Sequence, residues 1–452
     1  MIQVSEKKQV TYLAQLLECI SATSNSGVEW LKEVRESAKA LVQELEIPTT
    51  RDEEWRFTNL APLLDVKFQV GKAPELSPIS VNLLTLPEAN ESRLVFVNGV
   101  FSPDFSAINN LPEGIFVGNL LGIDSPQPAL NKGGISSEKI SKYLAKQQGG
   151  QELFTALNTA ALNDVAVVWV SKNVVVETPI HLLFISLAGE TSLITQPRCL
   201  IVAEPGSAMT IIEHYGTAEP GCPDSRKAHV YFNNPVTEIW VEENAQVNHT
   251  RVQRDAGDAF HIGKTAVSQS RNSRYTCHSV SLGASLSRHN LDIFQTGEGT
   301  ETTLNGLTLI GGEQLADTHS AIALNYPNSM TRQLNKCIVD DKARGVFNGK
   351  IFVRKGAQLT DAGQLSRNLL MSSKARVDTK PQLEIIADNV KCSHGATVSQ
   401  LNEDEMFYLQ SRGLDVDTSR HLLIDAFAGE ILCQLPLDSL RQMLARCVSC
   451  RT

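Results

Sequence analysis

SSKARVDTKPQLEIIADNVKCSHGATVSQL, the stretch from Ser372 to Leu401, contains the pattern that decides the fold. Two clusters of small and turn-forming residues within it, SSKARVD and SHGATVS, each lead into alternating apolar and polar residues. Alternation of this kind is typical of a β-strand with one buried face, and the clusters are typical of tight corners. The stretch therefore predicts short strands that follow one another with tight corners between them.

The same texture begins near Val165 and continues to Leu401, with further corners at EPGSAMT, EENAQVN, SLGASLS and RKGAQLT. Corners of this kind recur about every 15 residues at Ala343, Ala357, Ala375 and Val390. No long helical pattern intervenes, which excludes a doubly wound sheet and leaves a sandwich, a barrel or a β-solenoid. Imperfect repetition at this spacing favours a solenoid with stacked parallel strands.

Helical patterns flank these strands on both sides. Apolar residues share one face from residue 7 to 20 and again from 27 to 45, and Asn402 and Gly413 mark the start and stop of a later helix. The sequence thus predicts an N-terminal helical and irregular domain, a β core and a C-terminal helical domain, over residues 1–160, 161–401 and 402–452.

The bulk composition describes an ordinary folded protein of 452 residues, with 42% hydrophobic and 20% charged residues. The net charge of -9 gives no basic footprint for nucleic acid or for an anionic membrane. Its N-terminus, MIQVSEKKQV, has no apolar signal core, and no window approaches the roughly 18 apolar residues of a spanning helix. Nine scattered cysteines argue against a disulfide framework, so we expect a cytoplasmic protein with reduced thiols.

The segment HIGKTA resembles part of a phosphate-binding loop through Gly263, Lys264 and Thr265. The glycine that such a loop requires upstream would stand at position 258, which is Asp258, and no helix is expected to follow. Zinc-peptidase and nucleophile-elbow signatures are absent as well. The sequence therefore predicts no ATPase and none of these hydrolases.

Cys392 and His394 are the best pair of metal-binding residues by local spacing. Residues two apart in a strand share one face, and a thiol with an imidazole suits a soft metal. They supply at most two ligands, whereas iron-sulfur and structural zinc sites usually have four. A metal site here would be transient or completed by a second subunit; the alternative is an ordinary buried cysteine beside a surface histidine.

Other histidines are spread along the predicted strands, and stacked coils could bring some of them together. Strand patterning does not tell which ones meet, and solvated or hydrogen-bonded structural residues remain the alternative for most of them. They are His214, His249, His261, His278, His289 and His319.

From Gln364 to Leu414 the chain resembles the SufB/SufD family of iron-sulfur cluster assembly proteins. The resemblance is carried by DTKPQLEI, by DNVKCSHGAT and by the helix FYLQSRG, with Asn389 in place of an aspartate and Ser399 in place of a glycine. Asn368 stands where the SufB branch has a cysteine, and SHGAT stands where that branch has HEAST. On both counts the sequence is similar to the SufD branch.

The resemblance implies a right-handed parallel β-helix (solenoid) flanked by N-terminal and C-terminal α-helical domains. It also implies a non-enzymatic scaffold of the SufBCD complex, which builds a transient iron-sulfur cluster for apo-protein acceptors. SufB would pair with the β-helix edge, and the SufC ATPase would bind the C-terminal helices. Whether the complex also carries flavin stays open.

The same resemblance implies roles for single residues. His394 matches the family's histidine at the cluster site on the SufB interface, and Cys392 is the weaker candidate for a ligand. For the partner surface, the residues implied are Phe407, Tyr408, Arg412, Gly413, Leu422 and Phe427.

A polysaccharide-acting β-helix enzyme, either a lyase or a hydrolase, is the alternative function. Such an enzyme needs clustered acids or a calcium-binding set of carboxylates in one groove, and it is normally exported. The sequence has neither a signal peptide nor an acidic cluster, so a scaffold is favoured.

Overall fold

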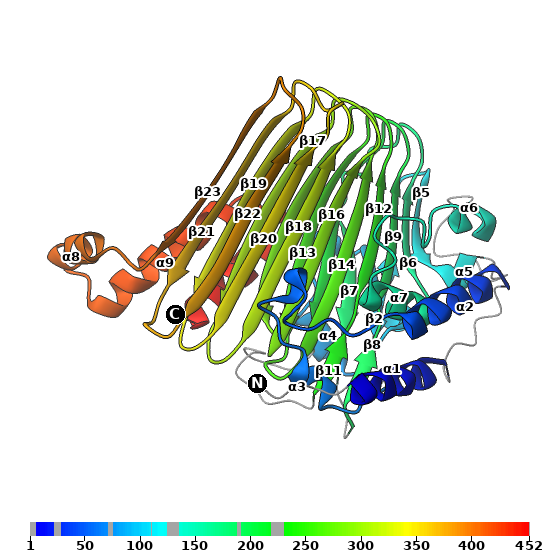
Figure 1. Cartoon of the computed structure of the whole chain (residues 1–452), viewed down its shortest axis with the longest axis horizontal. Helices are drawn as coiled ribbons and strands as arrows, with labels where there is room; N and C mark the ends of the chain where they lie inside the picture. Colours follow the sequence, from blue (N-terminus) through cyan, green and yellow to red (C-terminus); the bar gives the residue numbers. More distant parts are fainter. Residues whose placement is uncertain are drawn as a thin grey trace.

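The computed structural model describes residues 6–21, 29–70, 76–109, 111–123, 135–187, 191–217 and 230–451. Two long sheets face each other, and the chain alternates between them. Each coil therefore adds one parallel strand to each of the two sheets (Figure 1). Sheet A runs in the order β22-β20-β18-β16-β14-β12-β9-β6-β5, and sheet B in the order β23-β21-β19-β17-β15-β13-β10-β7-β2-β3. This is a β-solenoid with helices at both ends of the chain, as the sequence predicts.

The strands of sheet A are β5 (Ile115–Asn119), β6 (Ala166–Val170), β9 (Arg198–Ala203), β12 (Val236–Val241), β14 (Phe260–Gln269), β16 (Leu286–Gln295), β18 (Leu315–Leu324), β20 (Arg344–Val353) and β22 (Arg376–Ile385), with β1 (Gln69–Val70), β8 (Leu193–Thr195) and β11 (Tyr231–Asn233) beside them. Sheet B contains β2 (Ser92–Val97), β3 (Val100–Phe101), β4 (Ala107–Ile108), β7 (Ile180–Ile185), β10 (Ala208–Gly216), β13 (Gln246–Asp255), β15 (Arg274–Gly283), β17 (Glu301–Ile310), β19 (Met330–Val339), β21 (Asp361–Leu370) and β23 (Lys391–Ser399).

The helices are α1 (Glu6–Ser21), α2 (Glu29–Glu44), α3 (Ala61–Leu64), α4 (Pro78–Asn82), α5 (Leu120–Ile123), α6 (Ser137–Ser141), α7 (Leu153–Ala160), α8 (Glu403–Ser411), α9 (Val416–Leu432) and α10 (Asp438–Arg451). Three short 3-10 turns are η1 (Glu53–Trp55), η2 (Pro87–Ala89) and η3 (Pro103–Phe105).

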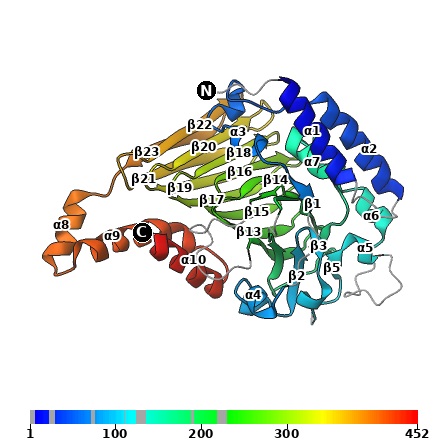
Figure 2. The ribbon, with the colours of Figure 1, turned by 90° about the horizontal axis from the view of Figure 1, so that it is seen from below.

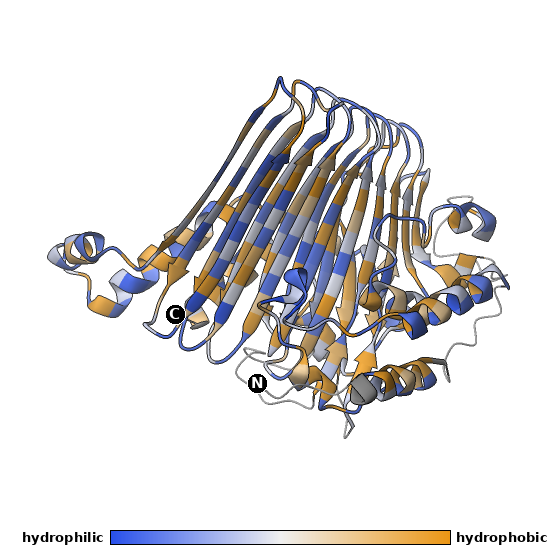
Figure 3. Cartoon of the chain, in the orientation of Figure 1, coloured by the Kyte–Doolittle hydropathy of each residue, from blue (hydrophilic) through white to orange (hydrophobic). Residues whose placement is uncertain are grey.

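Alternating side chains along each strand divide the solenoid into an inner and an outer face. Apolar and polar residues accordingly alternate along the strands in Figure 3. The inner face carries the main apolar core, to which Ile211, Ile293 and Ile351 belong. One coil occupies about thirty residues, as Gln364 bonds to Gln333 at a sequence separation of 31. Each inner position is therefore stacked on its counterpart from the previous coil.

The corners contain small buried residues where the chain turns sharply. Ala343, Ala357 and Ala375 are all buried at such corners, as expected. The prediction of a corner at SHGATVS is wrong, because Ser393–Ser399 lies inside β23, and the corner comes earlier, at Ala387–Val390. Serine and glycine look turn-forming locally, but pairing with β21 overrides that preference.

The N-terminal region is more than helical and irregular, because it also contributes strands to the solenoid. β2 pairs in parallel with β7 and extends sheet B, while β5 pairs antiparallel with β6 and ends sheet A. Helices α1 and α7 pack over the outer face of sheet A near Phe260 and Ile262. Figure 2 shows the N-terminal and C-terminal helices on different sides of the wedge-shaped solenoid.

Helices α9 and α10 cover the outer face of sheet B. Buried residues such as Ile424 and Leu444 pack there against Val280 and Ile338 of the strands. Helix α8 extends beyond the solenoid end and contributes no buried residue (Figure 1). Within the described ranges, no helix is both long and apolar enough to cross a membrane.

Candidate functional site

The solenoid ends on two strands that each pair on one side only. Among the described residues, β22 pairs with β20 alone and β23 with β21 alone, so both present a free edge. The Lys391 N–H donates to Thr360 O at 2.8 Å, toward β21. Because N–H groups alternate sides along a strand, those of Cys392, His394 and Ala396 point to the free edge. This end of the molecule therefore has an unpaired edge on each sheet.

Cys392 and His394 lie together on the inner face of β23. Cys392 is in register with Ala362 and packs against the apolar core, while His394 is in register with the buried Gln364. His394 is exposed because no further coil covers the end of the solenoid. The two side chains therefore share one face, as their spacing predicts, and both stand at the open end.

The donor set at this end is incomplete on the chain. No group of three or more histidine, cysteine, aspartate or glutamate side chains in the described part of the chain could hold a metal ion. Burial raises the pKa of the Cys392 thiol, although a backbone hydrogen bond with Ala362 opposes this effect. The thiol consequently stays protonated at neutral pH until a metal displaces its proton. The end strand could supply one or two ligands to a site that another chain completes.

Asn368 is the residue that stands in the place of the SufB-branch cysteine. It lies on the inner face of β21, and its side-chain amide donates to Ser366 Oγ at 3.1 Å and to Thr397 O at 2.9 Å. Its amide therefore ties β21 to the end strand, a structural role that a cysteine would not fill equally well.

Three of the histidines singled out from the sequence lie inside the middle coils. His249 Nε2 is 3.2 Å from Glu213 Oε2, and its Nδ1 is 2.9 Å from the Tyr275 hydroxyl. Burial alone would lower the pKa of His249, but Cys277 and Glu213 outweigh it and raise the pKa to about 9. His261 and His289 are also enclosed, at 2.8 Å from Asp255 Oδ2 and 3.0 Å from Thr265 Oγ1 respectively.

His249, His261 and His289 lie on β13, β14 and β16, in coils remote from β23. They therefore do not join the pair formed by Cys392 and His394. Of the other candidate histidines, His214 stacks on His181 with ring centroids 5.7 Å apart. His278 Nδ1 is 3.5 Å from Asn305 Nδ2. The stacking of coils does bring histidines to partners, but the partners are structural ones that strand patterning could not identify.

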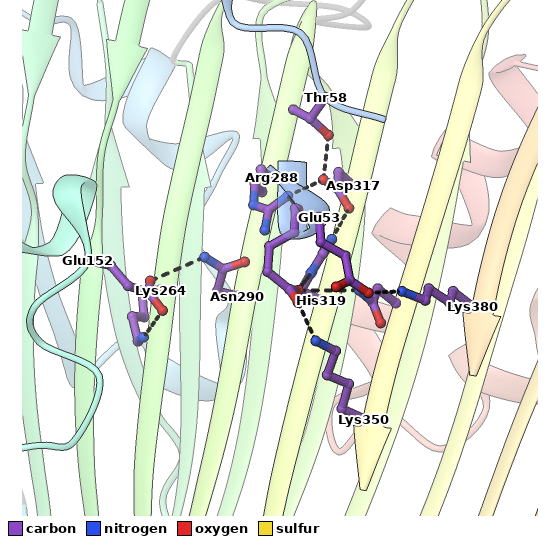
Figure 4. Close-up of polar contacts among 12 residues, drawn as sticks. Glu53, Thr58, Glu152, Lys264, Arg288, Asn290, Asp317, His319, Lys350 and Lys380 are labelled. Atoms are coloured by element: carbon purple, nitrogen blue, oxygen red, sulfur yellow. Dashed lines mark hydrogen bonds and ion pairs between the residues drawn. The ribbon is translucent and has the colours of Figure 1, made fainter. Parts of the chain in front are cut away.

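His319 differs because it lies on the outer face of sheet A, beneath a segment of the N-terminal region. We call residues 49–57 the strap. His319 Nε2 is 2.9 Å from Asp317 Oδ1, and its Nδ1 is 3.4 Å from Glu54 Oε2 of the strap (Figure 4). Burial alone would lower the pKa of His319, but the carboxylates of Asp317 and Glu54 outweigh it and raise the pKa.

The strap carboxylates also pair with lysines on the last two strands of sheet A. Lys350 on β20 pairs with Glu54, and Lys380 on β22 pairs with Glu53 at 2.5 Å. The hydrogen bond with His319, supported by Lys350, lowers the pKa of Glu54 to about 2. The sequence does not predict this cluster, because Glu53 and Lys380 are 327 positions apart.

The residues implied for the partner surface divide into exposed and partly covered ones. Phe407 is 74% exposed and Tyr408 is 56% exposed on α8, and Leu422 of α9 is exposed as well. Phe427 is instead packed into the helix-to-sheet core, with the Lys336 ammonium 4.1 Å from its ring centroid. A free apolar surface therefore exists on α8 and early α9 but does not include Phe427.

Arg412 and Gly413 shape the end of α8. The Arg412 guanidinium reaches the Tyr408 hydroxyl at 3.3 Å and lies 5.3 Å from its ring centroid. Gly413 has a φ of +94°, a conformation that favours glycine, and it ends the helix as the sequence predicts. Both residues support the exposed aromatic surface.

The chain is similar to known proteins over most of its length. Residues 185–427 match the SufBD core domain of the SUF system for iron-sulfur cluster assembly, and residues 5–182 match the SufBD protein N-terminal region. A SufBD family iron-sulfur cluster assembly protein of Synechocystis is 50% identical, over 92% of this chain and 90% of the relative. Iron-sulfur cluster assembly protein SufD of Escherichia coli is 32% identical over 88% of each chain, and that of Bacillus subtilis is 26% identical over 92% of each.

Proposed function

Because the chain belongs to the SufBD family of iron-sulfur cluster assembly proteins, we propose that it is a non-catalytic scaffold that shares a nascent cluster with a SufB partner. The observation that carries this proposal is the position of Cys392 and His394 on the inner face of an open end strand. The family assignment favours this role over the polysaccharide-acting alternative.

The proposed partner contact is pairing of strands at the free edge. Two rows of unpaired backbone groups, on β22 and β23, are suited to a partner that continues both sheets. Exposed apolar side chains at this end, including Ile385, Ile386 and Val398, would be buried by the same contact. A partner with the same solenoid fold matches the edge in strand spacing and in the distance between sheets.

His394 would bind iron as a neutral imidazole through one ring nitrogen. The chain supplies too few donors by itself, so the remaining ligands would come from the SufB partner and from sulfide. The cluster is thus cargo held between two chains, and a site shared in this way can be opened when the cluster is transferred. Cys392, whose thiol is partly packed in the core, is the weaker second ligand.

The proposed contact with the SufC ATPase uses α8 and the start of α9. Phe407, Tyr408 and Leu422 are exposed there, and the Arg412 guanidinium lies against the Tyr408 ring. Large exposed aromatic residues are typical anchors of protein interfaces. Their position beyond the solenoid leaves the free edge accessible to SufB at the same time.

The test is the iron and sulfide content of the complex after His394→Ala. The chain is coexpressed with SufB and SufC, purified as the complex and reconstituted anaerobically, with flavin measured in the same samples. We expect the complex to assemble normally and its affinity for the cluster to fall at least about tenfold, because loss of a direct ligand costs no less than loss of a supporting residue.

Two matched variants accompany this measurement. Ser393→Ala changes the outer face of the same strand and should keep the wild-type iron content. Cys392→Ala should have a mild effect if the thiol only packs, and an effect equal to that of His394→Ala if the two residues ligate jointly. Wild-type iron and sulfide in the His394→Ala complex would refute the proposed cluster site.

A further inference from the structure

A cavity of about 410 Å³ lies between the strap and the outer face of sheet A, on the side of the solenoid away from sheet B. Its walls come from the strap and from β18, β20 and β22. A volume of this size falls in the range of small-molecule sites. The cavity is separate from the Cys392 and His394 pair, which lies on the inner face of sheet B.

Around this cavity, positively charged side chains outnumber negatively charged ones, because each of its carboxylates is paired with a cationic side chain. Asp317 is neutralised by Arg288 at 2.5 Å. Glu53 and Glu54 are paired with Lys380 and Lys350, which leaves His319 with a raised pKa as an additional cationic group. Glu53 and Glu54 thus balance two of the positive charges that the last strands of sheet A present to the strap.

Two further arginines line the cavity. Arg51 and Arg56 of the strap form no ion pair within the described ranges, and the Arg56 guanidinium lies 5.7 Å from the Phe57 ring centroid. Asn348 on β20 also lines the cavity and is only 5% exposed. Its Nδ2 is directed at Glu54, at 3.4 Å. Several donors therefore converge on the position of the Glu54 carboxylate.

The strap is held by contacts that do not involve its carboxylates. Arg288 donates to the Glu54 backbone carbonyl at 2.7 Å, and its guanidinium lies 3.9 Å from the Trp55 ring centroid. Thr58, directly after the strap, donates through Oγ1 to Asp317 Oδ2 at 2.5 Å (Figure 4). The Glu53 and Glu54 side chains can therefore swing away while the strap backbone stays in position.

We propose that this cavity binds a small oxyanion with two or more negative charges, such as a diphosphate group, and that Glu53 and Glu54 are its displaceable internal occupants. Lys380, His319 and the Asn348 amide line the cavity and would donate to the ligand after the carboxylates leave, and Lys350, the present partner of Glu54, would do so from its edge. Arg51 and Arg56 supply the charge that the strap carboxylates do not neutralise. Charge-assisted hydrogen bonds of this kind are the usual means of holding phosphate groups.

Isothermal titration calorimetry of the full chain with inorganic pyrophosphate at low salt tests this proposal. Because the carboxylates compete with the ligand, the Glu53→Gln/Glu54→Gln double variant should bind pyrophosphate at least about tenfold more tightly than the wild type. Adding Lys380→Gln to the double variant should remove most of that gain. A purely structural ion-pair cluster would instead give no pyrophosphate binding in any variant.

Two further variants control for general charge and for folding. Lys391→Gln removes an exposed lysine of β23 that does not line the cavity, and it should leave pyrophosphate binding unchanged. Arg56→Gln in the otherwise wild-type chain should weaken binding, which tests the site without disturbing the strap carboxylates. Equal losses in Lys391→Gln and Lys380→Gln, or absence of binding to the double variant with a wild-type unfolding temperature, would overturn the proposal.

Discussion

His319 connects the strap to the solenoid through its protonated form. It faces Glu54 of the strap, Asp317 of its own strand and Arg288 of β16, while Lys350 of β20 pairs with the same Glu54 carboxylate. Its two carboxylate neighbours outweigh burial and the nearby cations, so its pKa is higher in the folded chain than in the unfolded one. The imidazolium therefore stabilises the fold, and the neutral ring does so less.

This gives a prediction for the pH dependence of stability. A raised pKa contributes stability that is fully present below the unfolded value of about 6.5 and is lost as pH rises through the folded value. His319→Gln should thus destabilise the chain most near pH 6 and progressively less at higher pH. Urea unfolding of both proteins from pH 6 to 9 measures the difference, and a difference that does not change with pH would contradict the assignment.

At the scale of single residues, the sequence predicts local relations well and distant ones poorly. The common face of Cys392 and His394 follows from strand alternation alone, and the helix stop at Gly413 follows from its lack of a Cβ. The strap partner of His319 comes from a segment far earlier in the chain. No periodic pattern connects such residues, so only the fold shows that Glu54 and His319 meet.

At the scale of elements, the alternating pattern predicts where strands lie better than it predicts the exact corners, and the strands from β13 to β22 are longer than the short strands expected, with ten residues in β14 and β20. SHGATVS has turn-forming residues but lies inside β23, because its ladder with β21 decides the conformation. β2 and β5 were missed in the N-terminal region, since short strands among loops have little periodicity of their own. They are nevertheless essential to the two sheets, which they extend beyond the first coils.

The free edge gives a prediction at this scale. The Ala396 N–H points to the free edge of β23 and follows the flexible Gly395, so Ala396→Pro removes a donor that the isolated chain does not use. We expect the variant to fold with a nearly unchanged unfolding temperature but to bind SufB at least about tenfold more weakly, because the ring also blocks the incoming strand. Surface plasmon resonance with immobilised SufB measures the affinity.

Thr397→Pro is the control variant for Ala396→Pro, because it places proline at the next position of the same strand. The Thr397 N–H faces β21, so this substitution breaks a bond within the chain and should lower its own stability. Wild-type affinity of Ala396→Pro for SufB would show that the partner does not pair with β23, and the contact would then have to be sought on another surface.

At the scale of the whole molecule, the solenoid has two covered outer faces and one open end. The N-terminal helices cover sheet A, and α9 and α10 cover sheet B through a continuous apolar core. Removing residues 402–452 would therefore expose the apolar outer face of sheet B as well as remove α8. The solenoid and its helical flanks could be predicted from the sequence, but which helix covers which sheet depends on side chains brought together only by coiling.

Helix α8 lies beyond the solenoid end and exposes two aromatic side chains, which leads to a prediction. The double variant Phe407→Ala/Tyr408→Ala alters only exposed side chains, so the unfolding temperature should change little. Exposed aromatic anchors typically contribute about 2 kcal/mol or more to an interface, so binding to the SufC ATPase should weaken at least about tenfold. Tyr326→Ala is a matched control, because Tyr326 is an exposed aromatic residue at a solenoid corner. If the α8 variant bound SufC as tightly as the control did, the exposed aromatic pair would have to serve another partner, and the ATPase would have to bind elsewhere.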